Sequence, residues 1–162
     1  MTFRYRDETK IRFAESFGVD HIFIREVESE DSTATIQIVN DDCAEGSCGL
    51  VMLFPDGPTE FAVATVDAIP DIPVNGTAVY LELEYKTDIN LSIGLQAEVN
   101  GTEFEQYFFT LTPTDTWNKV YIDMADILLA SQLDSYRILI GALNLEDEPV
   151  EVRVDNIKLL HF

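Results

Sequence analysis

The sequence predicts an all-β protein: an antiparallel β-sandwich, a jelly roll of about ten strands, with at most one short helix. Three observations support this fold. Turn signals separate short β-rich runs roughly every eight to twelve residues. The last segment of the chain alternates apolar and polar residues, and helical spacing of apolar residues occurs only in residues 125–133.

The final segment, residues 148–162, is the most regular strand candidate. Valine alternates with polar residues over 150–154, the polar pair Asp155–Asn156 interrupts the pattern, and Ile157 resumes it. Strict alternation is typical of a half-buried strand, and the change of phase predicts a β-bulge at the pair. Such a strand needs a sheet to join, and the preceding segments provide one.

The first half of the chain contains short runs rich in β-branched and aromatic residues. In order, the candidate strands lie around residues 3–5, 11–13, 21–27, 33–39, 49–54 and 60–67. The run 49–54 is apolar throughout, so we expect a central strand that is buried on both faces. Two prolines place residues 69–76 in a loop, because proline cannot donate to a central ladder.

The second half contains clearer strands. They cover residues 79–86, 91–99, 104–111, 117–124, 136–143 and 148–162. The pair Asn100–Gly101 is a strong hairpin signal, and residues 112–116 and 146–149 read as turns. Because no stretch resembles a linker, we expect a single domain over residues 1–162.

Composition limits the classes of partner. The 162 residues can bury a core without obligatory metals or disulfides. With 30 acidic and 10 basic residues, the net charge of −20 repels phosphate backbones and anionic lipids, so we expect no nucleic acid and no membrane contact. The acidity suits cations, neutral ligands or solubility alone, and we expect a monomer. The start lacks an apolar signal region, which indicates a cytosolic protein or a trimmed piece.

Two cysteines, Cys43 and Cys48, flank a glycine in an acidic stretch. This spacing favours a disulfide that closes a tight surface loop, and a disulfide would indicate an oxidising compartment. Free thiols are the alternative. A zinc site would need two further ligands, and the only histidines, His21 and His161, lie far away in the sequence.

Three segments resemble a known family. They are VYLELEYKTD over 79–88, DTWNKVYID over 115–123 and VDNIKL over 154–159. Together they are similar to Bacteroidetes cell-surface lipoproteins, whose C-terminal jelly rolls resemble galactose-binding-like and carbohydrate-binding modules. The resemblance runs from about residue 77 to the end of the chain. It implies an extracellular or cell-surface location and a lipid-anchored part that lies outside this chain.

The resemblance also implies a structural Ca²⁺. In jelly-roll carbohydrate-binding modules, an acidic residue of the last strand often joins one near the first strand around this ion. Here these residues would be Asp155 and Glu15, with backbone carbonyls completing roughly six to eight oxygen ligands. The alternative is that Asp155 accepts hydrogen bonds from backbone groups freed by the bulge.

Alternation along the strands also predicts a polar sheet face. Its expected ligand-binding residues are Tyr80, Glu82, Gln96, Tyr107, Arg137 and Arg153. Aromatic faces stack on the C–H face of a neutral sugar, while amide and charged groups pair with its hydroxyls. The alternative is a solvated sheet face with cross-strand ion pairs, which is ordinary for an antiparallel sheet.

These patterns favour a non-catalytic carbohydrate-binding-like module that binds a polysaccharide or other glycan. The alternative is a structural or protein-contact domain of a surface lipoprotein without a glycan ligand. A jelly-roll glycoside hydrolase would use Glu82 and Glu84 as paired carboxylates. We do not favour an enzyme, because the sequence lacks a third carboxylate in that strand and any nucleophile, zinc-protease or phosphate-loop motif.

Overall fold

A computed structural model describes residues 10–15, 24–27, 34, 36–65, 78–131 and 135–161, with side chains for 34, 36–62, 78–128 and 136–159. The described residues form eleven strands and one short helix. The elements are β1 (Lys10–Glu15), β2 (Ile24–Val27), β3 (Gln37–Val39), β4 (Cys48–Leu53), β5 (Glu60–Thr65), β6 (Val79–Thr87), β7 (Leu91–Val99), β8 (Thr102–Leu111), β9 (Thr114–Asp123), α1 (Ala125–Ser131), β10 (Ser135–Leu143) and β11 (Val150–His161).

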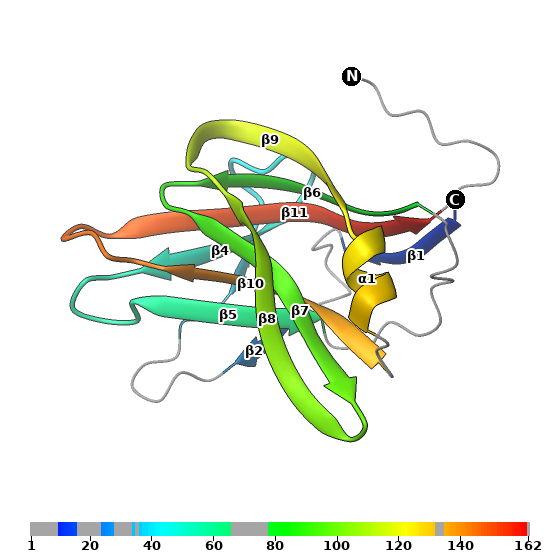
Figure 1. The fold of residues 1–162 in the computed structure, drawn as a ribbon. Coiled ribbons are helices and arrows are strands. Elements are labelled where there is room, and N and C mark those ends of the chain that lie inside the picture. The colour runs from blue at the N-terminus through cyan, green and yellow to red at the C-terminus, as the bar shows by residue number, and fades with distance from the viewer. Residues whose placement is uncertain are drawn as a thin grey trace.

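The strands form two antiparallel sheets that pack as a sandwich (Figure 1). Sheet A has six strands in the order β3-β4-β11-β6-β9, with β1 also paired to β11. Sheet B has five strands in the order β2-β5-β10-β7-β8. Strands that are consecutive in sequence, such as β8 and β9, repeatedly lie in different sheets. The predicted all-β jelly-roll sandwich is therefore confirmed.

Strand β11 holds sheet A together. It pairs with β6 over most of its length, while its other edge pairs with β4 up to Val154 and with β1 from Ile157 onward. The predicted bulge lies between these two partners: the register against β6 shifts between Asp155 and Lys158, and Asn156 has a φ of 49°. The extra residue keeps the apolar residues on both sides of the bulge facing the core.

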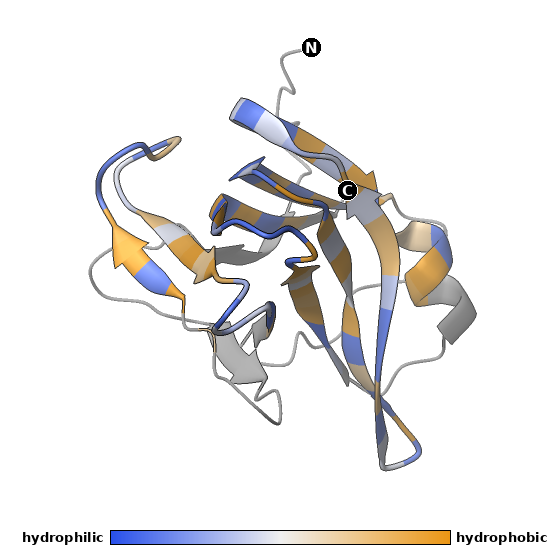
Figure 2. Ribbon diagram, turned by 90° about the vertical axis from the view of Figure 1, so that its left-hand side faces the viewer, coloured by the Kyte–Doolittle hydropathy of each residue, from blue (hydrophilic) through white to orange (hydrophobic). Residues whose placement is uncertain are grey.

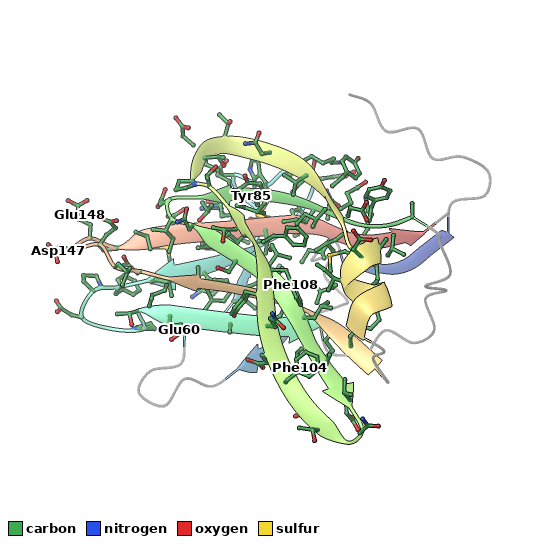
Figure 3. All side chains as sticks on the ribbon, viewed as in Figure 1. Glu60, Tyr85, Phe104, Phe108, Asp147 and Glu148 are labelled. Carbon is green, nitrogen blue, oxygen red and sulfur yellow. A yellow bond between two sulfur atoms is a disulfide. The ribbon has the colours of Figure 1, made fainter. Side chains whose placement is uncertain are left out.

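The core lies between the two sheets. Alternate residues of the central strands face inward, such as Leu81 and Leu83 of β6 or Ile138 and Ile140 of β10. Figure 2 shows the resulting alternation of hydrophobic and hydrophilic residues along the strands. Phe104 and Phe108 belong to β8 and pack against the core (Figure 3). Burial of apolar surface is the main stabilising contribution in such a sandwich.

The short helix α1 closes one end of the sandwich between β9 and β10 (Figure 1). The Asp123 carboxylate accepts a hydrogen bond from the Ala125 N–H at 3.0 Å, which satisfies one of the free amides at the start of the helix. Leu128 is buried in the core. The helical spacing predicted for residues 125–133 therefore corresponds to a real element. Within the described residues no helix is both long and apolar enough to cross a membrane.

The Asn100–Gly101 turn joins β7 and β8 as predicted. Both residues have left-handed backbone conformations, with φ of 50° and 76°. Two such residues in succession match the right-handed twist of the flanking strands, which explains why asparagine and glycine occupy the turn.

Some predicted boundaries differ from the structure. Residues 49–54 correspond to β4, which lies between β3 and β11, yet its Leu50 and Met52 side chains are partly exposed. The expectation of a strand buried on both faces is therefore wrong, because no element of the described chain fully covers the outer face there. Strand β9 begins at Thr114, inside the predicted turn 112–116. The candidate strand at 3–5 and the loop 69–76 lie outside the described residues.

Gly94 marks a second bulge, between β7 and β8. A Cβ at this position would collide with the Gln106 carbonyl oxygen and lie 2.7 Å from the Tyr107 Cα. These atoms belong to the backbone of the paired strand, so the collision cannot be relieved by rotating a side chain. The close approach of the two strands at the bulge therefore requires glycine.

We expect Gly94→Ala to lower the free energy of unfolding by about 1–3 kcal/mol, because the two strands must move apart. Chemical denaturation of the purified protein measures this change. Ser92→Ala, two residues earlier in β7, is the matched control and should change stability by less than about 0.5 kcal/mol. Equal stability of the Gly94→Ala variant and the wild type would show that the bulge tolerates a side chain.

Candidate functional site

The six residues predicted to bind a ligand divide between the two sheets. Those in sheet A are Tyr80, Glu82 and Arg153, and those in sheet B are Gln96, Tyr107 and Arg137. The prediction that they share one surface is therefore wrong. Alternation identifies which residues share a face of one strand, but β6 and β7 follow each other in sequence and lie in different sheets.

In sheet A, Glu82 is part of an ion cluster. Its side chain is 1% exposed, and its carboxylate lies 3.2 Å from the Lys158 Nζ and 3.6 Å from the Lys119 Nζ. Burial alone would raise its pKa, but hydrogen bonds from Lys158 and Tyr121 and the two lysine charges hold the pKa below its ordinary value. Glu82 is thus a buried, ionised partner of lysines, with little surface to offer a ligand.

Glu84 belongs to the same cluster. Its carboxylate accepts a hydrogen bond from the Asn156 Nδ2 at 2.6 Å and lies 3.3 Å from the Lys119 Nζ. The hydrolase hypothesis required one member of the Glu82–Glu84 pair to carry a proton as general acid. The ionised Glu82 does not fit that role, and both carboxylates hold together β6, β9 and β11.

Arg153 anchors a surface loop. Residues 40–47, here named the cysteine loop, precede β4, and Cys43 and Cys48 form a disulfide with their Cα atoms 5.4 Å apart. The Arg153 Nη1 donates to the Asp41 carbonyl oxygen at 2.9 Å, and its Nε lies 3.2 Å from the Glu151 carboxylate. Arg153 is 7% exposed. Its contacts therefore position the loop, and they leave little of the guanidinium for a ligand.

Two further contacts fix the cysteine loop to sheet A. The Lys86 Nζ lies 2.6 Å from the Asp42 carboxylate, and the hydrogen bond and charge of this lysine hold the pKa of Asp42 below its usual range. The indole Nε1 of Trp117 donates to the Asp42 carbonyl oxygen at 3.2 Å. The loop therefore covers part of the outer face of sheet A.

Asp155 is fully buried beneath this loop. Its Oδ2 accepts the Glu45 N–H at 3.0 Å, and its Oδ1 accepts the N–H of Asn156 at 2.8 Å. Burial is the largest influence on the pKa of Asp155 and raises it, the two backbone hydrogen bonds lower it, and the charges of Glu84 and Glu45 raise it. Together they bring the pKa of Asp155 to about 6. The backbone-bonding role that the sequence left open for Asp155 is therefore present.

The predicted calcium site needs Glu15, whose side chain lies outside the described set. The backbone of Glu15 ends β1, where it pairs with Ile157, two residues from Asp155. Among the described residues, no group of three or more histidine, cysteine or acidic side chains could hold a metal ion. Asp155 alone is not a sufficient ligand set for Ca²⁺. The calcium site stays a prediction.

In sheet B, Tyr107 lies across the outer face. Cross-strand pairing aligns Tyr107 with Gly94 and Leu139. A Cβ at Gly141 would collide with the Tyr107 hydroxyl and lie 2.8 Å from its Cζ, so the ring extends from β8 across β7 to β10. The absence of a side chain at Gly141 leaves room for the end of the ring to lie over β10. Tyr107 is 42% exposed.

A polar row runs beside the ring. Arg137, Gln96 and Glu105 are paired across β10, β7 and β8. The Gln96 Nε2 donates to the Glu105 carboxylate at 2.8 Å, and the Arg137 Nη1 lies 3.5 Å from the Gln96 Oε1. The row presents a guanidinium, an amide and a carboxylate side by side on the sheet surface.

The face continues beyond Gly141. Leu143, on the same side of β10, is 49% exposed and pairs with Glu60 of β5, whose position Figure 3 shows. Leu139 on this side is fully buried, so the accessible part comprises the ring, the polar row and the end of the sheet near Leu143. We name this surface the Tyr107 face. It consists of Glu60, Gln96, Glu105, Tyr107, Arg137, Gly141 and Leu143.

Sequence reasoning did not identify Glu60, Glu105, Gly141 or Leu143 as parts of a site. Glu105 could have been found from the Asn100–Gly101 turn, because that turn fixes the register of β7 against β8. Glu60 of β5 and the β10 residues Gly141 and Leu143 could not have been found in this way. Their placement depends on pairing between segments that are far apart in sequence.

Two hollows lie at one end of the sandwich and share Asp88. Their volumes are about 260 and 350 Å³, and acidic residues of the β9 start and of the β10–β11 loop line them. The Asp88 carboxylate accepts the Glu151 N–H at 2.8 Å. Asp88 therefore connects the β6–β7 turn to the start of β11, which is a structural role.

No protein-family model matches the chain, and neither does any curated protein sequence. Comparison with solved structures finds the same fold in carbohydrate-binding modules. The family 11 module of a cellulosomal cellulase of Clostridium thermocellum aligns with a TM-score of 0.63 and 18% identity, over 96% of this chain and 95% of the module. A second structure shows the family 11 module of this organism in complex with a β-1,3-1,4-mixed-linked tetrasaccharide. It aligns with a TM-score of 0.61 and 17% identity, over 93% of this chain and 94% of the module.

A third similar structure belongs to another family. The C-terminal family 22 carbohydrate-binding module of Clostridium thermocellum Xyn10B aligns with a TM-score of 0.61 and 14% identity, over 95% of this chain and 96% of the module. Another family 22 structure of the same similarity is described as a xylan-binding domain. These likenesses establish a shared jelly-roll fold that extends along nearly the whole chain.

The raised pKa of Asp155 predicts a pH dependence of stability. The folded state binds the Asp155 proton more tightly than the unfolded state does, so this residue stabilises the fold at low pH and the contribution is lost as pH rises from about 4 to about 6. The contribution amounts to about 3 kcal/mol at most. Asp155→Asn removes the titrating group and therefore this part of the pH profile.

Unfolding free energies of the wild type and Asp155→Asn, measured from pH 4 to 7, test this expectation. The difference in unfolding free energy between the two proteins should change with pH. The wild type should become more stable relative to Asp155→Asn as the pH falls toward 4. Acidic groups elsewhere titrate in both proteins and cancel in the difference. Parallel profiles would mean that Asp155 keeps an ordinary pKa in the folded protein.

Proposed function

We propose that the chain is a non-catalytic carbohydrate-binding module that holds a glycan on the Tyr107 face. The observation that carries this proposal is the exposed Tyr107 ring beside the polar row of Arg137, Gln96 and Glu105. The fold shared with carbohydrate-binding modules supports it.

The residues of the face match the chemistry of a sugar. A pyranose ring presents C–H groups on its faces, which pack on an aromatic ring, and hydroxyl groups at its edge. The Arg137 guanidinium donates hydrogen bonds, the Glu105 carboxylate accepts them, and the Gln96 amide does both.

The outer face of sheet A is the poorer candidate. Tyr80 lies there, but Glu82 is buried among lysines and Arg153 beneath the cysteine loop. Both side chains are almost fully buried, with 1% of Glu82 and 7% of Arg153 exposed, so they offer a ligand little surface. We therefore restrict the proposed ligand-binding set to Gln96, Tyr107 and Arg137.

Location and calcium remain parts of the proposal. The Cys43–Cys48 disulfide supports an oxidising, extracellular or cell-surface environment. A surface lipoprotein stays a prediction from the sequence resemblance, since no family model or curated sequence matches the chain. A structural Ca²⁺ at Asp155 and Glu15 would bind next to the bulge of β11, where it would join β1 to the cysteine loop.

One observation favours a different function, that of a protein-contact domain. Leu145 is 81% exposed and Phe54 is 40% exposed. Asn144 connects their loops, because its N–H donates to the Thr59 carbonyl and its side chain lies 3.4 Å from the Leu53 carbonyl. Apolar residues exposed at one end of the sandwich are typical of contact surfaces.

A comparison of two tyrosines tests the proposal. We expect Tyr107→Ala to weaken retention on mixed-linked β-glucan or xylan by at least roughly tenfold, since it removes the stacking ring. Tyr80→Ala, a matched change on sheet A, should retain wild-type binding. Affinity electrophoresis measures retention, and denaturation checks that each variant stays folded. Loss of retention with Tyr80→Ala alone would place the site on sheet A, and no retention of the wild type on any neutral glycan would favour the protein-contact function.

Gly141→Ala offers a second test that leaves Tyr107 in place. The added methyl group would occupy the position of the Tyr107 hydroxyl, so the ring must move away from β10. The nearest backbone atom, the Phe61 carbonyl oxygen, is 3.2 Å from the added Cβ, so the strands can adjust. We expect glycan binding to fall toward that of Tyr107→Ala while the protein remains folded. Unchanged glycan binding by Gly141→Ala would show that binding does not depend on the Tyr107 ring lying over Gly141.

A further inference from the structure

The charged side chains of the Tyr107 face and its neighbours on sheet B are mostly of one sign. Four carboxylates and one guanidinium have described side chains on this outer face. The carboxylates belong to Glu60, Glu98, Glu103 and Glu105, and the guanidinium belongs to Arg137. Arg25 of β2 occupies a register position near the opposite edge, paired with Ala64. Acidic groups therefore outnumber basic ones around the ring.

Two of these carboxylates belong to the strands at either side of the part of sheet B that the Tyr107 ring crosses. Glu105 lies on β8, and Glu60 begins β5 on the other side of β10. Burial, then the charge of Glu105 and then that of Glu60 raise the pKa of Tyr107 to about 12. An anionic group bound against the ring would lie in the field of these two carboxylates.

The rest of the molecule does not compensate for this charge. The net charge of the chain is −20. On sheet A, Lys119 and Lys158 already pair with carboxylates of β6, and Lys86 pairs with Asp42 of the cysteine loop. At low salt, a ligand that carries carboxylates would meet repulsion both from the whole molecule and from the face itself.

We infer that Glu60 and Glu105 make the Tyr107 face selective by charge, so that it binds uncharged glycan chains and repels chains that carry carboxylate or sulfate groups. This inference rests on the proposed function and adds the class of glycan to it. Both carboxylates also accept hydrogen bonds from sugar hydroxyls, so they favour neutral chains while they exclude anionic ones.

Calorimetric titration of the full chain with matched polymers tests the inference. The probes are mixed-linked β-glucan and xylan, each unmodified and carboxymethylated, so that backbone and linkage stay constant. At about 0.01 M salt, where the screening length is about 30 Å, we expect the carboxymethylated form to bind roughly tenfold more weakly. At about 1 M salt, where the screening length is about 3 Å, the unmodified and carboxymethylated forms should bind with equal affinity.

Two double variants separate the local charges from the net charge. Glu60→Gln with Glu105→Gln removes both charges, keeps one acceptor oxygen on each side chain and should bring the affinities for the unmodified and carboxymethylated polymers together at low salt. Asp115→Asn with Asp126→Asn removes two exposed charges from β9 and α1, outside sheet B, and should leave the difference in place.

Each outcome bears on a separate claim. Equal or tighter binding of the carboxymethylated polymer at low salt would overturn the charge inference while the glycan-binding function stands. An equal effect of the two double variants would assign the selectivity to the net charge and overturn the role of Glu60 and Glu105. Absence of binding to both unmodified polymers would refute the proposed function, and the inference that rests on it, for these glycans.

Discussion

The structure depends on the change of partner along β11. One edge of this strand pairs first with β4 and then with β1, and the bulge at Asp155–Asn156 lies where the partner changes. Without the extra residue, either Val154 or Ile157 would face away from the core, because a shift of one position reverses every side chain. The left-handed Asn156 and the buried Asp155 carboxylate satisfy the backbone at this point.

The two outer faces of the sandwich use polar residues differently. On sheet A, lysines and carboxylates pair with each other, and a disulfide-closed loop covers part of the surface. On sheet B, a glycine in β10 lets one aromatic ring lie across the strands beside a polar row. The polar groups of the row contact one another on the sheet surface, whereas Glu82 and Arg153 of sheet A are almost fully buried. On this difference we base the proposal that the glycan surface belongs to sheet B.

Local patterns were sufficient for the fold and insufficient for the site. Alternation located nearly every described strand, and the phase change at Asp155–Asn156 located the bulge, because both depend on residues that are adjacent in sequence. The polar row of Gln96 and Arg137 required the pairing of β7 with β10, and the position of the Tyr107 ring depends on Gly141, which lies two strands away from β8. Such placement follows from sheet order, which alternation does not encode. The burial of Glu82 and Arg153 was missed for the same reason: the residues that cover them come from distant segments.

The single tryptophan has a practical consequence. Trp117 donates its indole hydrogen bond to the cysteine loop on sheet A, while the proposed ligand surface belongs to sheet B. Its emission therefore reports on whether that loop is docked. Tryptophan fluorescence would change when the disulfide is reduced, but it would not change when a glycan binds at Tyr107. An optical assay for ligand needs a dye or a second indole introduced on the opposite layer.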